Sequence, residues 1–146
     1  MPKTLLALGL ATCGFFAIPL FDTASIAHQT VKTSDVEAMI HLDPDDRPYA
    51  NKQTLAWAML TKRNGEMISP AKCNCRMMAY DSQNRAIARN LPLSSMQMEG
   101  HKQGHEAIRT TIKFPKPGVY TVVLTGQAKD KSFAPFEFKV PVTVRP

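Results

Sequence analysis

From residue 35 to the end of the chain, hydrophobic and polar residues alternate with the period of two that is typical of β-strands. Within 35–42, for example, Val36, Ala38, Ile40 and Leu42 share one face of the predicted strand. The pattern predicts about seven short strands, at 35–42, 53–61, 72–80, 86–91, 107–114, 119–125 and 133–144.

Two of these segments also indicate their places in a sheet. Residues 53–61 (QTLAWAMLT) are apolar on both faces, which favours a central strand that is covered on both sides. Pro141 lacks the N–H group that a strand ladder needs, so we expect 133–144 at a sheet edge.

No segment shows the period of an amphipathic helix. Because strands without helices must cover one another, the sequence predicts an all-β fold, a single immunoglobulin-like β-sandwich. The longest stretch between predicted strands is 92–106, and a loop of that length in a compact domain is usually functional or mobile.

The first 27 residues follow a different pattern. Lys3 precedes an unbroken apolar run at 5–21 (LLALGLATCGFFAIPLF), and the small residues Ser25 and Ala27 follow it. This layout is typical of a secretory signal peptide, and it predicts export with cleavage after Ala27. The alternative is a retained membrane anchor, although the run is at the short limit for crossing a bilayer.

Composition fits one ordinary folded domain, predicted at 28–146. The chain has 146 residues, of which 44% are hydrophobic and 21% are charged. The net charge of this domain alone is also +6, because residues 1–27 contain one basic and one acidic residue, whose charges cancel. The basic residues are scattered and form no run, which argues against nucleic acid as a partner.

The most unusual short segment is Cys73-Asn74-Cys75. In an extended strand the two cysteines lie on one face, about 6.6 Å apart at Cα, which is near the upper limit for a disulfide. A bond between them therefore requires a bend. Both a redox-active disulfide and a paired thiolate site for a soft metal remain open.

The predicted loop 92–106 carries Met96, Met98, His101 and His105. Thioether and imidazole groups are donors that suit copper, Cu(I) in particular for the thioethers. The competing interpretation is that the cysteines and methionines are core residues and the histidines are solvated, because Cys and Met bury readily.

No catalytic motif is recognisable. Arg109 stands where a zinc protease helix needs its second histidine, and neither a Gly-x-Ser-x-Gly elbow nor a phosphate-binding glycine loop is present. The acidic segment 43–46 (DPDD) lacks the spacing of a calcium loop and fits a turn between strands. We therefore expect that the chain is not an enzyme.

Several segments together resemble small exported immunoglobulin-like domains of the YtkA-like kind. They are 41–44 (HLDP), 53–57 (QTLAW), 64–65 (NG) and 114–122 (FPKPGVYTV). The likeness is closer still to an uncharacterised cyanobacterial exported family with a Cys-x-Cys strand, which implies the periplasm or the thylakoid lumen. CopC-like copper carriers share this architecture and bind copper through an exposed N-terminal histidine, a role that the resemblance gives to His28.

Three functional hypotheses follow. The first is a non-catalytic binding or accessory domain without a cofactor, which acts on an unidentified protein partner or complex; a membrane is involved only through a retained N-terminal segment. The second is a copper-handling module, with ligands drawn from His28, Cys73, Cys75, Met96, Met98, His101 and His105. The third is a redox role for the Cys73–Cys75 pair.

Overall fold

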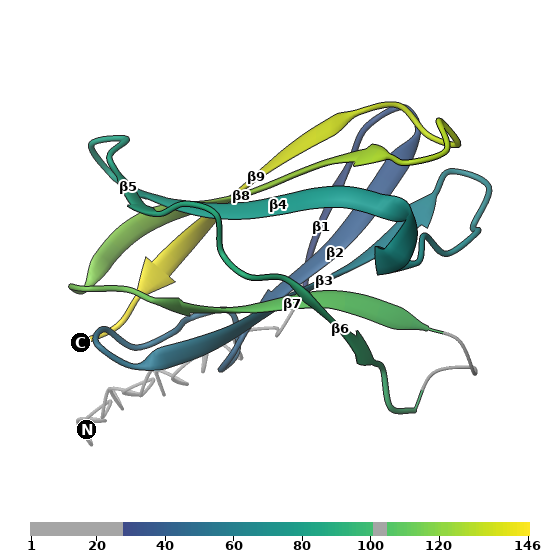
Figure 1. Cartoon of the computed structure of the whole chain (residues 1–146). Coiled ribbons are helices and arrows are strands. Elements are labelled where there is room, and N and C mark those ends of the chain that lie inside the picture. Colours follow the sequence, from purple (N-terminus) through teal and green to yellow (C-terminus); the bar gives the residue numbers. More distant parts are fainter. Residues whose placement is uncertain (1–27, 101–104) are drawn as a thin grey trace, which may run out of the picture.

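Two antiparallel sheets pack face to face in the computed structural model, which describes residues 28–100 and 105–146 (Figure 1). The predicted all-β sandwich is confirmed. The predicted signal peptide lies outside the described residues. The strands are β1 (Gln29–Lys32), β2 (Val36–Leu42), β3 (Gln53–Lys62), β4 (Cys73–Asp81), β5 (Ala86–Ala88), β6 (Ser94–Gln97), β7 (Glu106–Lys113), β8 (Gly118–Ala128) and β9 (Phe136–Val144), with one 3₁₀ turn, η1 (Pro70–Lys72).

The larger sheet has the order β1-β2-β3-β7-β6 and the smaller sheet β5-β4-β8-β9. The strand that is apolar on both faces, β3, lies at the centre of its sheet, as predicted. The strand that contains Pro141, β9, lies at an edge, also as predicted. The side-chain amide of Gln29 donates to the Pro141 carbonyl oxygen at 3.2 Å, so β1 approaches this edge.

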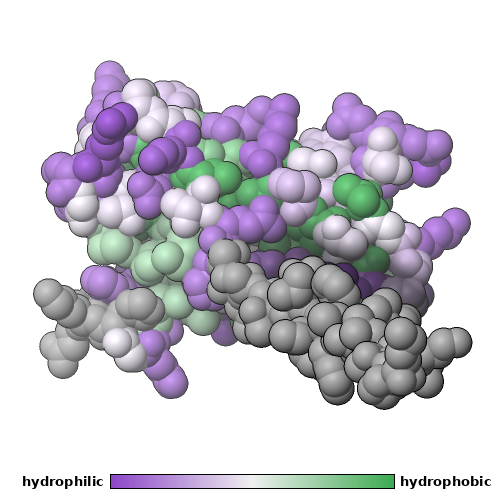
Figure 2. Space-filling view, turned by 180° about the vertical axis from the view of Figure 1, so that it is seen from behind, coloured by the Kyte–Doolittle hydropathy of each residue, from purple (hydrophilic) through white to green (hydrophobic). Residues whose placement is uncertain are grey.

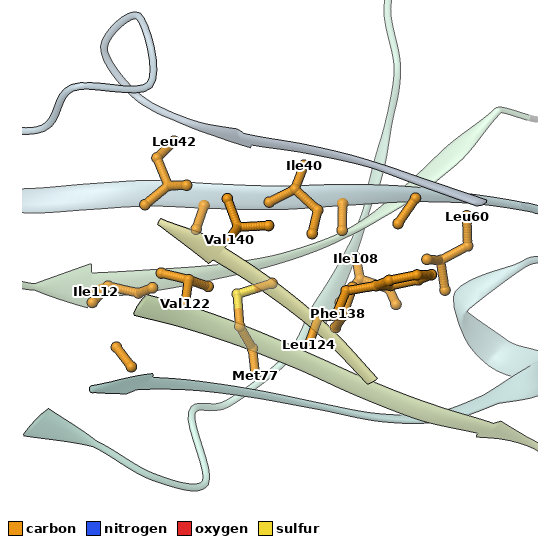
Figure 3. Close-up of a cluster of buried hydrophobic side chains, with 14 of the residues drawn as sticks. Ile40, Leu42, Leu60, Met77, Ile108, Ile112, Val122, Leu124, Phe138 and Val140 are labelled. Atoms are coloured by element: carbon orange, nitrogen blue, oxygen red, sulfur yellow. The ribbon is translucent and has the colours of Figure 1, made fainter. Parts of the chain in front are cut away.

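The inward faces of both sheets form one hydrophobic core. Figure 3 shows side chains from the two sheets meeting between the ribbons, with Ile40 and Leu60 on one side and Met77 and Leu124 on the other. These four side chains are almost fully buried. Burial of this apolar surface is the main favourable contribution to folding.

Two strands were not predicted, β1 and β6. Both are four residues long, lie at opposite edges of the larger sheet and contain no buried residue. Such short edge strands bury too little to show a hydrophobic alternation. The prediction of an unstructured stretch over 92–106 is therefore wrong, because β6 occupies part of it and pairs with β7.

Polar turns connect the strands, and the turn between β4 and β5 shows how they are held. The Asp81 carboxylate accepts the backbone N–H groups of Gln83 (3.0 Å) and Arg85 (2.9 Å). The hydrogen bond from the Arg85 backbone, the largest cause, holds the pKa of Asp81 below its usual value, because it stabilises the charged form.

The surface carries charged residues of both signs. Ion pairs such as Lys62–Glu66 and Lys139–Glu137 lie on it, each at 3.0 Å. On the face seen in Figure 2, hydrophilic residues gather around the rim and hydrophobic residues lie between them. Within the described part of the chain, no helix has the length and apolar character needed to cross a membrane.

One backbone position has no room for a side chain. Gly126 of β8 lies opposite Cys75 of β4. A Cβ atom added to Gly126 would lie 2.5 Å from the Phe136 Cζ and 2.8 Å from the Cys73 Sγ. Contacts this short force the neighbours to move, so the packing of β4, β8 and β9 at this level requires glycine.

We therefore predict that Gly126→Ala lowers the free energy of unfolding by about 1–3 kcal/mol through overpacking. Urea denaturation followed by circular dichroism measures the change. The exposed neighbour Gln127 provides the control, since Gln127→Ala is expected to stay within about 0.5 kcal/mol of the wild type. Equal effects of the two substitutions would contradict the assignment.

Candidate metal centre

Three side chains with metal-binding atoms converge where the described chain begins. They are His28, just before β1, His41 in β2, and Asp46 in the turn after β2. Their ligand atoms all lie within 4.8 Å of one another. The His41 Nδ1 is 3.1 Å from the His28 Nδ1 and 3.0 Å from the Asp46 Oδ1.

Strand register explains why the two histidines meet. The core residues Ile40 and Leu42 point between the sheets, so His41 points to the opposite face of β2. β1 pairs with β2 through Gln29 and Ile40, and one further step along this ladder places His28 beside His41. Directly opposite residues of antiparallel strands have Cβ atoms about 4.5–5.5 Å apart, so their side chains can share a ligand.

The turn that follows β2 fixes the Asp46 carboxylate. The Asp46 backbone N–H donates to the Leu42 carbonyl oxygen, and the Leu42 N–H donates to the Asp46 Oδ1, both at 2.8 Å. Asp45 and Asp46 have φ values of 49° and 56°, in the left-handed region that aspartate tolerates better than most residues. The sequence predicted this turn but not the role of its last aspartate.

A second carboxylate orients the His41 ring. The Asp43 Oδ1 lies 3.0 Å from the His41 Nε2. A carboxylate only accepts hydrogen bonds, so Nε2 carries the proton and donates it. In the tautomer that carries its proton on Nε2, Nδ1 offers its lone pair toward His28 and Asp46. Histidines that bind metals are commonly held by such a carboxylate on the other ring nitrogen.

The converging atoms are of the kind that can hold a cation. The Nδ1 lone pair of His41 and the Asp46 Oδ1 are both acceptors, so a proton or a metal ion must neutralise the space between the three side chains. The Asp46 Oδ2 is also buried, with no hydrogen-bond partner among the described residues. Donors about 2.0–2.2 Å from one ion can lie 3.0–3.1 Å apart, so the distances from the His41 Nδ1 to His28 and to Asp46 suit a first-row metal.

An aromatic ring forms one wall of the site. The Trp57 ring centroid lies 5.7 Å from that of His28 and 5.3 Å from that of His41. Trp57 is almost buried, whereas His28 is exposed. The site is therefore closed on the side of β3 and accessible on the side of His28.

The other predicted ligands lie elsewhere. Cys73 and Cys75 are joined in a disulfide in β4, with Cα atoms 5.2 Å apart, because the strand bends there. Met96 lies on β6, at the edge of the sheet opposite β1. The Met98 N–H donates to the His105 carbonyl oxygen beside β6 and β7 (3.0 Å), and His101 lies outside the described residues.

Of the predicted ligands that the structure describes, only His28 belongs to the cluster. Sequence analysis missed His41 and Asp46. One signal was available, an outward-facing histidine at the end of a strand, directly before an acidic turn.

No family model and no curated protein matches this chain. Solved structures do match. A DUF4426 family protein from Pseudomonas aeruginosa is 10% identical with a TM-score of 0.52, over 81% of this chain and 99% of that one. FetP of uropathogenic Escherichia coli strain F11, expressed in the periplasm of E. coli, is 11% identical with a TM-score of 0.53, over 82% and 94%.

A copper-bound variant of FetP is 12% identical with a TM-score of 0.54, over 81% of this chain and 95% of that one. At these identities the likeness shows the fold alone. It agrees with the β-sandwich described above. The resemblance to YtkA-like domains stays a prediction.

We predict that Asp46→Ala lowers the free energy of unfolding by about 1–3 kcal/mol, since it leaves the Leu42 N–H without its acceptor. Asp46→Asn keeps an acceptor oxygen and tolerates the positive φ, so its stability should stay close to that of the wild type. Thermal and urea denaturation of metal-free protein measure both. A large loss in Asp46→Asn would mean that the charge, rather than the hydrogen bond, supports the turn.

Proposed function

We propose that this chain is an exported, non-catalytic accessory domain that binds a copper ion through His28, His41 and Asp46. The observation that carries the proposal is the convergence of three ligand atoms around the Nδ1 of His41. The copper-bound FetP variant, a protein of similar fold, supports the choice of ion, and the periplasmic expression of FetP supports export.

The donor set favours Cu(II) among the available ions. Imidazole nitrogen suits copper, zinc, iron and nickel, and Cu(II) has the highest affinity of the divalent first-row series for a given N/O site. Cu(I) prefers thiolate and thioether donors, and the disulfide leaves Cys73 and Cys75 without free thiolates. Three protein donors leave positions open for exchange with a partner protein.

The predicted processing would add a fourth donor. Cleavage after Ala27 makes His28 the first residue. Its α-amino group then belongs to the same residue as the Nδ1 that points into the site. An amine and an imidazole of the same residue can bind one ion together. In this proposal export therefore completes the metal centre.

We expect protein that begins at His28 to bind one equivalent of Cu(II), with quenching of Trp57, the single tryptophan of the chain. His41→Ala should abolish stoichiometric binding because His41 contributes the central ligand atom. Fluorescence titration measures the stoichiometry and electron paramagnetic resonance reports the nitrogen donors.

Two matched variants separate the loss of a metal ligand from other effects of a substitution in the same turn. Asp46→Asn should weaken Cu(II) binding, whereas Asp45→Asn, in the same turn, should not, because Asp45 pairs with Arg145 (2.9 Å) outside the cluster. Wild-type affinity in both His41→Ala and Asp46→Asn would exclude the proposed centre, provided that circular dichroism shows both variants to be folded.

The Asp43 carboxylate, which orients the His41 ring, leads to a further prediction about metal affinity. Asp43→Ala removes the acceptor from the His41 Nε2 without removing a ligand. Loss of such a supporting contact typically lowers metal affinity about 10–100-fold. Competition with a chelator of known affinity measures the change, and an unchanged affinity would show that Asp43 does not orient the ring.

A further inference from the structure

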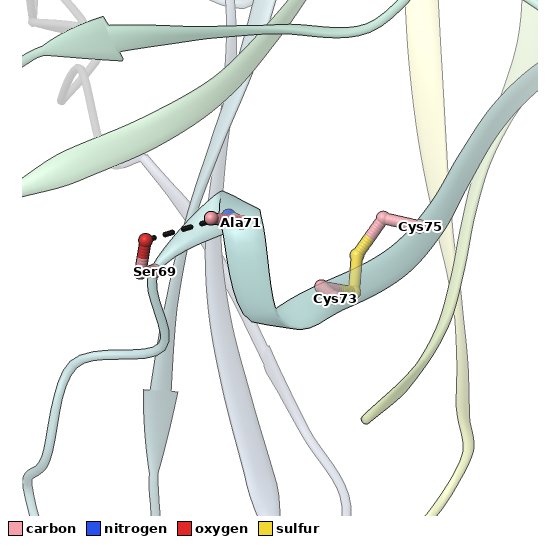
Figure 4. The surroundings of a disulfide bond; sticks show 4 residues. All are labelled: Ser69, Ala71, Cys73 and Cys75. Carbon is pink, nitrogen blue, oxygen red and sulfur yellow. Dashed lines mark hydrogen bonds between the residues drawn. A yellow bond between two sulfur atoms is a disulfide. The ribbon is translucent and has the colours of Figure 1, made fainter. Parts of the chain in front are cut away.

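The Cys73–Cys75 disulfide lies far from the metal centre in the fold, in the other sheet. It joins cysteines separated by a single residue at the start of β4, directly after η1. Figure 4 shows both cysteine side chains on the same side of the strand, connected through their sulfur atoms.

The position of this disulfide implies that it contributes little to the stability of the fold. A disulfide stabilises chiefly by restricting the unfolded chain, and the effect shrinks as the closed loop becomes shorter. This loop contains three residues. β4 is also held along its whole length by β8, from Cys73 opposite Ala128 to Asp81 opposite Tyr120. The strand therefore keeps its place without the bond.

The two sulfur-bearing residues differ in access. Cys73 is 6% exposed, whereas Cys75 is only partly buried. Two hollows meet at Cys75. One, of ≈ 540 Å³, lies beside Arg76, Gly126 and Phe136, and the other, of ≈ 200 Å³, lies beside Pro70 and Leu93. Both cysteines border the smaller hollow, and Cys75 is the more exposed of the two, so we expect an incoming thiol to reach Cys75 first.

The charge around these hollows suits an anionic reactant. No acidic residue lines either of them. A thiolate is the attacking species in disulfide exchange, and no carboxylate among the lining residues repels it.

We propose that Cys73–Cys75 is a thiol–disulfide exchange site that accepts two electrons from the dithiol of a partner protein. One partner thiolate attacks the Cys75 Sγ, the S–S bond breaks, and Cys73 leaves as a thiolate that takes up a proton. The second partner thiol loses its proton and attacks the partner's sulfur in the mixed disulfide, the bond from that sulfur to the Cys75 Sγ breaks, and Cys75 leaves as a thiolate that takes up a proton. The partner becomes the disulfide and both cysteines become thiols. This activity does not depend on the proposed copper site.

Two single variants test which sulfur reacts. Cys73→Ala leaves the accessible Cys75 thiol, and Cys75→Ala leaves the buried Cys73 thiol. With an aromatic disulfide as the probe, Cys75 should form the mixed disulfide at least about tenfold faster than Cys73, since access and thiolate character set the rate. Equal rates, or faster reaction of Cys73, would overturn the assignment.

The wild-type protein provides a measurement that does not depend on the folding of the variants. Reduced glutathione is added to native protein, free thiols are alkylated, and mass spectrometry locates the glutathione. We expect it on Cys75, with the circular dichroism spectrum unchanged after full reduction by dithiothreitol. Reduction that proceeds only as fast as global unfolding in urea would show a structural disulfide and refute the exchange site.

Discussion

The alternation of β2 places Val36, Ala38, Ile40 and Leu42 between the sheets, and the rest of the structure depends on that placement. All four are at most 1% exposed. With this face fixed in the core, His41 has only the opposite face available. A register shift of one residue would turn the four apolar side chains away from the core and turn His41 into it. The energy of the core thus also determines where the central nitrogen of the proposed metal centre lies.

The proposed metal centre in turn bears on a weakly held edge strand. β1 is four residues long, and β2 is its only ladder partner. An ion bound by His28, His41 and Asp46 would link the start of β1 to β2 and to the turn after it. A ligand that binds only the folded state stabilises that state by mass action. The centre would then act as a clamp on the N-terminal edge as well as a binding site.

The sequence predicted the sandwich because the long strands carry their own signal. β3, β8 and β9 show runs or alternations that only a half-buried or buried strand explains. β1 and β6 were not predicted because their short segments contain no buried residue and show no such pattern. The candidate metal centre was not predicted for another reason. His28 and His41 meet through the register of β1 on β2, which is a tertiary property, and composition drew attention instead to the sulfur atoms of Cys73, Cys75 and Met96.

The two proposed chemistries are kept apart by the fold. The histidine and aspartate donors lie on the outward face of the larger sheet, whereas the disulfide lies in β4 of the smaller one. The core between the sheets, which includes Ile40 and Met77, separates them. Because Cu(I) prefers thiolates, a dithiol beside the copper site would compete for the ion on reduction. With the core between them, each site can change its state without supplying ligands to the other.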